Sequence, residues 1–363
     1  MIDALDSAWM ARALHLAERG LYTTSPNPRV GCVLVKDGAI IGEGWHERAG
    51  NAHAEVLALS AAGEAAHGAN AYVTLEPCSH HGRTPPCTDA LIAAGVARVV
   101  FAVQDPNPEV SGEGVAKLRA AGIEIDYGLM EETARELNIG FFARMTRGTA
   151  WVRSKVAMSL DGRTALSNGK SKWITGKDAR RDVQHWRARS CAILTGIDTV
   201  LADDPRMDVR EIATDRQPLR AVLDSRLRMP LSARILSGGK VLVYTAGHNA
   251  EKCAALETAG ATVCVVPGTN GQVDLPAMLH DLAQRGCNEV LLEAGGMLNG
   301  AMLRAGLVDE LLLYIAPQLL GDLSRGMAQL GELTSLDQRI NLKWRDMRQV
   351  GNDLRILAKV ENV

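Results

Sequence analysis

Aromatic side chains are scarce in this sequence of 363 residues, where Phe, Trp and Tyr together make up 4%. Proteins that hold nucleic acid stack its bases on such side chains and attract its phosphates with a basic surface. The formal net charge of -2 offers no excess of positive charge. We therefore expect a small-molecule partner and no nucleic acid.

Long apolar runs and a secretion signal are also missing. No apolar stretch approaches the roughly 20 residues that span a bilayer. The opening residues MIDALDSAWM are acidic where a signal peptide begins with basic residues. The seven cysteines are odd in number and irregularly spaced, which argues against a disulfide framework. These absences predict a cytoplasmic protein with no membrane partner.

Charge and pattern divide the chain into two halves. Residues 1–147 contain 12 Lys/Arg and 18 Asp/Glu, a net charge of -6, and the remainder contains 28 and 24, a net charge of +4. In both halves helical patterns alternate with short apolar strands, which is typical of layered α/β domains. A single helical pattern runs through EETARELNIGFFARM, and the segment TRGT then precedes a new strand, WVRSKVAMSL. We predict domains at 1–147 and 148–363.

A candidate zinc site lies in the first half. His53 opens an apolar helix, Cys78 ends a strand, and Cys87 opens another helix. One His and two Cys leave the fourth position of tetrahedral Zn²⁺ open to water, as in catalytic sites, and the metal lowers the pKa of that water toward about 7. Glu55 stands two residues after His53 and can shuttle a proton from the water to a leaving amine. The pattern predicts hydrolytic deamination, with one Zn²⁺ per chain and Glu55 as the catalytic residue.

The H-x-E…P-C pattern resembles the zinc-dependent nucleobase deaminases, although eight residues separate the two cysteines where those enzymes typically have two. The longer segment CSHHGRTPPC resembles one family in particular, the bifunctional deaminase/reductases of riboflavin biosynthesis. That resemblance implies a cytidine-deaminase-like three-layer α/β/α domain. It also implies deaminase substrate contacts at Asn27, His46, His80 and Arg83. Solvated loop residues are the alternative interpretation of the histidines in this segment.

The second half lacks the G-x-G-x-x-G motif of standard dinucleotide-binding folds. Its useful signal is EAGGMLNG, which leaves an apolar strand through two glycines and enters a helix. Backbone N–H groups at a helix N-terminus can hold a phosphate, and glycine lets it approach. A tight strand-to-helix turn is the alternative interpretation of this pair of glycines.

Four further segments, KVAMSLDGRTA, SKWITG, LTGIDTVLADDPRMDVR and LEAGGMLNG, resemble the reductase domain of the same family, so the resemblance covers nearly the whole chain. It implies a dihydrofolate-reductase-like α/β domain that uses NADPH. The implied cofactor contacts are Ala157, Trp173, Thr199, Asp203, Ser225, Gly295, Gly296, Met297, Leu298, Asn299, Gly300 and Ala301. The implied substrate contacts are Ser171, Arg187, Met207, Arg210 and Glu293. The two arginines offer planar forks for a ribose phosphate, with a solvated helix face or loop as the alternative interpretation. No sequence signal identifies a general acid for the reduction; Lys155 and Asp161 are polar candidates, with surface or supporting roles as the alternative.

The resemblance implies two consecutive reactions on a pyrimidine ribosyl phosphate. The first domain deaminates 2,5-diamino-6-ribosylamino-4(3H)-pyrimidinone 5′-phosphate, and the second reduces the ribosyl side chain to ribityl with NADPH, giving 5-amino-6-(5-phosphoribitylamino)uracil. It also implies a homodimer or higher homo-oligomer through the second half, where ELLLYIAPQLL is expected to supply an apolar surface.

Three other functions remain to be weighed against this one. A nucleic-acid-editing deaminase would bind RNA tightly in a salt-sensitive way. A deaminase with a catalytically silent second domain would not consume NADPH. A purely structural zinc protein would need a fourth protein ligand, which no remaining cysteine offers at a fitting spacing.

Overall fold

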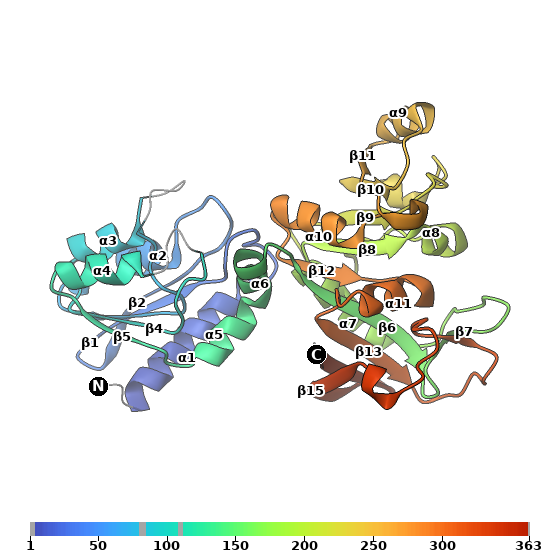
Figure 1. The fold of residues 1–363 in the computed structure, drawn as a ribbon. Coiled ribbons are helices and arrows are strands. Elements are labelled where there is room, and N and C mark those ends of the chain that lie inside the picture. Colours follow the sequence, from blue (N-terminus) through green and yellow to red (C-terminus); the bar gives the residue numbers. More distant parts are fainter. Residues whose placement is uncertain (1–3, 80–84, 108–111, 362–363) are drawn as a thin grey trace. The chain divides into compact units, whose positions relative to one another are not determined.

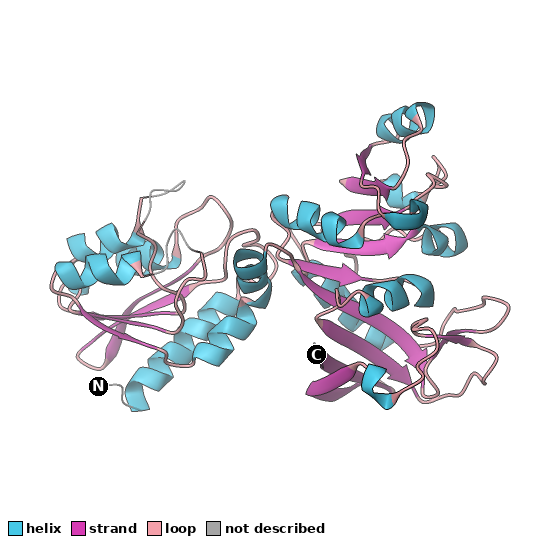
Figure 2. Ribbon diagram, in the orientation of Figure 1, coloured by secondary structure: helices cyan, strands magenta, loops and turns pink. Residues whose placement is uncertain are grey.

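The computed structural model describes residues 4–79, 85–107 and 112–361. The chain forms two compact units, Met1–Gly148 and Thr149–Val363. Within the described residues, no helix is both long and apolar enough to cross a membrane. Figure 2 shows that helices and strands alternate through both units.

The first unit is built on a five-stranded sheet with the order β2-β1-β3-β4-β5. β1 runs antiparallel to both β2 and β3, whereas β3, β4 and β5 are parallel. The elements are α1 (Ala4–Glu18), β1 (Gly31–Lys36), β2 (Ala39–Trp45), α2 (Ala54–Ala62), η1 (Gly63–Ala66), β3 (Asn70–Val73), α3 (Cys87–Ala93), β4 (Arg98–Phe101), α4 (Glu113–Ala120), β5 (Glu124–Tyr127), α5 (Glu131–Leu137) and α6 (Ile139–Arg147).

Helices cover both faces of this sheet, because both faces of its strands are apolar (Figure 1). Successive residues of a strand point to opposite faces. Val33 and Val35 of β1 pack in the cluster that includes α1 and α6, and Cys32 and Leu34 pack in the one that includes α2, α3 and α4. The predicted three-layer α/β/α arrangement is therefore confirmed.

The single helix predicted over EETARELNIGFFARM is wrong, because Asn138 separates α5 from α6. The backbone of Asn138 leaves the helical region at φ -110° and ψ 20°. Its side chain accepts a hydrogen bond from the Arg29 backbone N–H at 2.7 Å and donates one to the Arg29 carbonyl at 2.9 Å. This pair of bonds joins the helix break to a segment more than 100 residues earlier, a contact that local periodicity does not reveal.

The second unit contains a nine-stranded sheet with the order β11-β10-β9-β8-β12-β6-β13-β16-β15. All neighbours from β11 to β13 are parallel, and β16 and β15 complete the sheet as an antiparallel hairpin. The strands are β6 (Trp151–Ser159), β7 (Arg163–Ala165), β8 (Ala192–Gly196), β9 (Leu219–Leu223), β10 (Val241–Thr245), β11 (Ala261–Val265), β12 (Glu289–Leu292), β13 (Glu310–Ala316), β14 (Arg325–Gly326), β15 (Asn341–Val350) and β16 (Asp353–Glu361).

Helices pack on both faces of the larger sheet, as parallel strands require. The helices are α7 (Lys177–Arg189), α8 (Ile197–Asp203), η2 (Arg234–Leu236), α9 (Ala250–Thr258), η3 (Thr269–Gly271), α10 (Leu275–Gln284), α11 (Gly296–Arg304) and η4 (Leu336–Gln338). Leu194 of β8 packs in the cluster that includes α10 and α11, whereas its neighbour Ile193 packs in the cluster that includes α8 and α9. The sequence did not predict α8, α9 or the β15–β16 hairpin.

The expectation that ELLLYIAPQLL supplies an apolar surface is wrong for its strand portion. β13 lies between β6 and β16, and six of its seven residues are buried. Leu312 and Tyr314 pack against α7, and Leu311 and Leu313 face the opposite core. The apolar run is continuous because the strand is covered on both faces.

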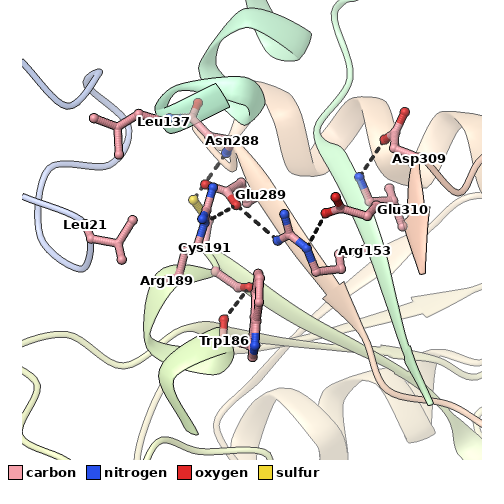
Figure 3. Close-up of polar contacts among 12 residues, drawn as sticks. Leu21, Leu137, Arg153, Trp186, Arg189, Cys191, Asn288, Glu289, Asp309 and Glu310 are labelled. Carbon is pink, nitrogen blue, oxygen red and sulfur yellow. Dashed lines mark hydrogen bonds and ion pairs between the residues drawn. The ribbon is translucent and has the colours of Figure 1, made fainter. Parts of the chain in front are cut away.

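A buried ionic cluster joins the central strands of this unit (Figure 3). Arg153 of β6 donates through Nε to Glu310 Oε2 at 2.6 Å and through Nη1 to Glu289 Oε2 at 3.2 Å. Arg189 of α7 donates to the same Glu289 oxygen at 2.7 Å. The Arg153 guanidinium also lies over the Trp186 ring, 4.6 Å from its centroid. The arginine thus bridges an acid on each neighbouring strand.

Candidate functional site

Three potential metal ligands converge in the first unit. His53 is the N-cap residue of α2, Cys87 is the first residue of α3, and Cys78 follows β3. His53 Nδ1 lies 3.2 Å from Cys87 Sγ and 3.6 Å from Cys78 Sγ, and all three ligand atoms lie within 4.8 Å of one another. Nitrogen and sulfur ligands of one tetrahedral Zn²⁺ stand about 3.6 Å apart, from the usual zinc–ligand lengths. The three residues therefore fit a zinc ion with a fourth position left open.

The local fold favours negative charge on the Cys78 sulfur. The Cys87 backbone N–H, at the start of α3, donates to Cys78 Sγ at 3.3 Å. Hydrogen bonds from Cys87 and His53 lower the pKa of Cys78 to about 4, while the proximity of Cys78 raises the pKa of Cys87. Without a metal the two thiols thus share one proton, and a bound divalent cation deprotonates a coordinating thiol.

Glu55 occupies the first turn of α2 and is 3% exposed. Burial, with the nearby Cys78 thiolate, raises the pKa of Glu55 to about 7. A carboxyl group with such a pKa can both accept and release a proton near neutral pH. Its position suits a proton carrier beside the metal ligands.

His53, Cys78 and Glu55 line a cavity of about 380 Å³ in the first unit. Two predicted substrate-binding residues, Asn27 and His46, line it as well, and two others, His80 and Arg83, lie outside the described residues. Sequence reasoning missed several polar lining residues, namely Asn51, Glu76, Asp105 and Asn107.

The loop after β4 contributes two of the missed residues. Buried Glu76 accepts hydrogen bonds from the backbone N–H groups of Asp105 at 3.3 Å and Gly112 at 3.0 Å, so it fixes the course of the loop around the cavity. The signal was present in the sequence: the loop follows the carboxyl end of a parallel strand, where α/β sheets place their ligands. Asp105 and Asn107 are polar residues in that loop.

Both ring nitrogens of His46 are hydrogen-bonded. Nε2 lies 3.1 Å from Asn27 Nδ2, and Nδ1 lies 3.1 Å from the Ala52 carbonyl oxygen. The ring is 3% exposed and stands edge-on to His53, with 5.2 Å between centroids. Burial lowers the pKa of His46, so the imidazole is neutral at neutral pH.

In the second unit, the predicted cofactor residues gather at one edge of the sheet. Parallel strands β9, β8, β12 and β6 are neighbours, so their carboxyl ends meet there. Ser225 follows β9, Thr199 and Asp203 lie in α8 directly after β8, Ala157 lies near the end of β6, and residues 295–301 follow β12. Trp173 lies in the loop before α7, with its side chain 72% exposed and the Arg180 guanidinium 4.4 Å from its ring centroid.

The glycines of residues 295–301 have different roles. A Cβ on Gly296 would meet the Gly326 carbonyl oxygen at 2.7 Å, and one on Gly300 would meet the Gln329 carbonyl oxygen at 2.1 Å. Both therefore let α11 pack closely against a neighbouring segment. Gly295, the N-cap residue of α11, faces open space. Only there does the lack of a side chain give a phosphate access to the helix N-terminus.

Side chains of two predicted contacts point into the protein instead. Asn299 is 1% exposed and donates to the carbonyl oxygens of Ala294 and Met327, both at 3.1 Å. Met207 is 4% exposed and packs in the apolar cluster with α8 and α9. Neither buried side chain is therefore placed to contact a ligand directly.

Two predicted substrate contacts, Arg187 and Glu293, bind each other. Arg187 Nε donates to Glu293 Oε1 at 2.6 Å and Nη2 donates to Oε2 at 3.0 Å, while Lys155 Nζ lies 3.7 Å from the same carboxylate. Burial alone would favour the neutral acid, but the two cations lower the pKa of Glu293 to about 2. Ser171 is half-buried, and the exposed Arg210 pairs with Asp208 at 2.6 Å. Lys155 therefore forms an ion pair with Glu293.

Asp161 has a structural role in the second unit. Its carboxylate accepts hydrogen bonds from the backbone N–H groups of Leu320 at 3.1 Å and Gly321 at 2.8 Å. It also accepts one from the Ser159 hydroxyl. These contacts hold the loop after β13 and give no reason to place Asp161 in the chemistry.

Both halves of the chain match known family models. Residues 3–103 match the cytidine and deoxycytidylate deaminase zinc-binding region, and residues 150–356 match the RibD C-terminal domain. These matches confirm the predicted deaminase-like and reductase folds.

Relatives of the whole chain carry the same assignment. The Escherichia coli riboflavin biosynthesis protein RibD is 50% identical over 96% of this chain and 98% of its own length. Its Aquifex aeolicus counterpart is 43% identical over 99% of both chains. The solved structure of Acinetobacter baumannii RibD has a TM-score of 0.92 at 47% identity and covers 99% of each chain.

A further solved structure names both activities. It is a Thermotoga maritima diaminohydroxyphosphoribosylaminopyrimidine deaminase/5-amino-6-(5-phosphoribosylamino)uracil reductase, with a TM-score of 0.87 and 33% identity, which covers 98% of this chain and 99% of its own. The zinc-binding and reductase domains occur in this chain in the same order. The protein therefore belongs to the RibD family of bifunctional deaminase/reductases of riboflavin biosynthesis.

Proposed function

We propose that the protein converts 2,5-diamino-6-ribosylamino-4(3H)-pyrimidinone 5′-phosphate to 5-amino-6-(5-phosphoribitylamino)uracil in two steps. The first step is hydrolytic deamination and the second is reduction of the ribosyl side chain by NADPH. The observation that carries the proposal is the convergence of His53, Cys78 and Cys87, two of which line one cavity together with Glu55. Similarity to full-length relatives with both domains supports the second step.

In the deaminase unit, His53, Cys78 and Cys87 would hold one Zn²⁺. When bound there, the ion would lower the pKa of a water toward about 7 and so would make it a nucleophile for the ring carbon that carries the amine. Glu55 accepts a proton from that water at its carboxylate and delivers a proton to the nitrogen that leaves as ammonia. Asn27 and His46, together with His80 and Arg83, form the remainder of the proposed substrate site.

In the reductase unit, bound NADPH supplies a hydride to the sugar C1. Gly295 at the open N-terminus of α11 gives the cofactor's phosphates access to backbone N–H groups. Arg187 and Lys155 keep Glu293 ionised, so its carboxylate can accept hydrogen bonds from the substrate while remaining fixed in place. The protein's part in this step is to position the two reactants.

We also propose the cellular location and the oligomeric state in which the reaction takes place. The reaction takes place in the cytoplasm, on a small-molecule substrate, by a homodimer or higher homo-oligomer. Full-length similarity to bacterial RibD proteins supports this setting. A monomer mass at working concentration in solution would refute the oligomer.

Loss of NADPH absorbance tests both steps and their order. The wild-type protein and Glu55→Gln each receive either the diaminopyrimidinone ribosyl phosphate or its deaminated uracil, and ammonia is measured in parallel. Wild type should consume NADPH with both compounds, whereas Glu55→Gln should respond only to the uracil. If ammonia is released but neither compound leads to NADPH consumption, the second unit is not the proposed reductase. If no ammonia is released, the deaminase assignment fails.

A further inference from the structure

The donor and the acceptor in the hydrogen bond between His46 and Asn27 can be assigned from the two contacts of the His46 ring. The Ala52 carbonyl oxygen has no hydrogen to give, so His46 Nδ1, 3.1 Å away, must carry the proton of that bond. In a neutral imidazole the other nitrogen then has no hydrogen and acts as an acceptor. The Asn27 amide nitrogen, Nδ2, lies 3.1 Å from Nε2 and can only donate, so Nε2 accepts and the ring is the neutral Nδ1–H tautomer.

An accepting Nε2 selects one orientation of the Asn27 amide. The group 3.1 Å from it must be the donor, the Nδ2 amino group, because two acceptors would repel. The amide oxygen, Oδ1, is then turned away from the imidazole. Within the described residues no group donates a hydrogen bond to Oδ1, and Asn27 lines the cavity that holds Glu55 and the metal ligands.

We propose that His46 is a positioning residue that holds the Asn27 amide with its oxygen toward the cavity, where Oδ1 accepts a hydrogen bond from an N–H or O–H group of the substrate. This inference rests on the proposed deaminase function. It changes the role of His46, because the ring acts through Asn27 and its own two nitrogens are already engaged. An amide with the opposite orientation would present its NH₂ group to the same substrate donor.

Two conservative variants separate this role from simple packing. In His46→Gln the side-chain oxygen can occupy the position of Nε2 and keep the acceptor for Asn27. In His46→Asn the shorter amide can occupy the position of Nδ1 and keep the donor to Ala52, but no atom then accepts the hydrogen bond from the Asn27 amide. Both are tested in the full chain, with reduction of the deaminated uracil as a control for folding.

Steady-state ammonia release should distinguish the pair. His46→Asn should raise KM for the diaminopyrimidinone ribosyl phosphate about tenfold with little change in kcat, as expected for one misplaced substrate hydrogen bond. His46→Gln should stay within about threefold of wild type, since the acceptor is restored. Equal KM increases in the two variants, or a loss confined to kcat, would overturn the proposal.

A spectroscopic measurement tests the same idea without substrate. In ¹⁵N-histidine-labelled, zinc-loaded protein, His46 should show a protonated Nδ1 and an unprotonated Nε2. The opposite tautomer, or a doubly protonated ring near neutral pH, would refute the orientation of Asn27. If wild type released no ammonia, the proposed function would fail, whereas the tautomer would still decide whether His46 orients Asn27.

Discussion

Replacing Arg153 should destabilise the second unit far more than replacing an equally close but exposed arginine. Arg153 and its acidic partners Glu289 and Glu310 have side chains that are only 3%, 1% and 2% exposed (Figure 3). In Arg153→Met, Glu289 would keep Arg189 as a close partner, but Glu310 would be left with only the more distant Arg345, 3.9 Å away. Removing one member of a buried ion pair typically costs about 3–5 kcal/mol, because a buried charge is left uncompensated. The stacking of the guanidinium on Trp186 would also be lost.

The matched control is Arg228→Met. Arg228 and Asp198 belong to the same unit and are also separated by 2.6 Å, but their side chains are 47% and 64% exposed. Water screens such a pair, so its loss should cost at most about 1 kcal/mol. The comparison holds the ion-pair distance fixed and changes the burial.

Amide hydrogen exchange of β6, β12 and β13 in the full chain would give the free energy of opening for each variant. Adding Glu310→Gln to Arg153→Met should restore part of the lost free energy of opening, because it removes a buried negative charge. The expected interaction energy between the two substitutions is about 1–3 kcal/mol. Similar losses for Arg153→Met and Arg228→Met would refute the argument from burial. So would a double variant whose loss equals the sum of the two single losses.

Two further outcomes follow from the candidate sites. Cys87→Ser should bind much less zinc than wild type by elemental analysis, whereas Cys253→Ser, which alters a buried cysteine outside the metal cluster, should retain about one ion per chain. The second outcome concerns the pH dependence of stability. Despite burial, Arg187 and Lys155 lower the pKa of Glu293 in the folded protein from 4.5 to about 2. The ionised Glu293 therefore stabilises the folded state fully above pH 4.5, and this stabilisation is lost as the pH falls toward 2. The difference in unfolding free energy between wild type and Glu293→Gln should therefore shrink from about 3 kcal/mol across that window, and denaturant titrations that show a constant difference would contradict it.

The convergence of the three candidate metal ligands was predictable because each has a local sequence signal. His53 precedes an apolar helical pattern, Cys87 begins another, and the fold places both at helix N-termini. For Asp105 the sequence offers a weaker signal, a polar residue after an apolar strand, and no sign of the partner that holds it. Asp105 owes its position to Glu76, which lies 29 residues earlier and holds the loop through backbone N–H groups. No periodicity connects these two positions, so only the folded chain shows that they meet.

In the reductase half, the sequence alone could not predict the role of Arg187. In the sequence, Arg187 is one cation among many on a helix, and a planar fork for a substrate phosphate was a reasonable prediction. In the fold, three of its N–H groups are already engaged, two by Glu293 and one by the Asp208 carbonyl oxygen at 2.9 Å. Glu293 is 106 residues away in the chain, so the pairing had no sequence signal. Because a buried carboxylate needs nearby cations to stay ionised, Arg187 acts with Lys155 to keep Glu293 charged, whether or not Arg187 also reaches a phosphate.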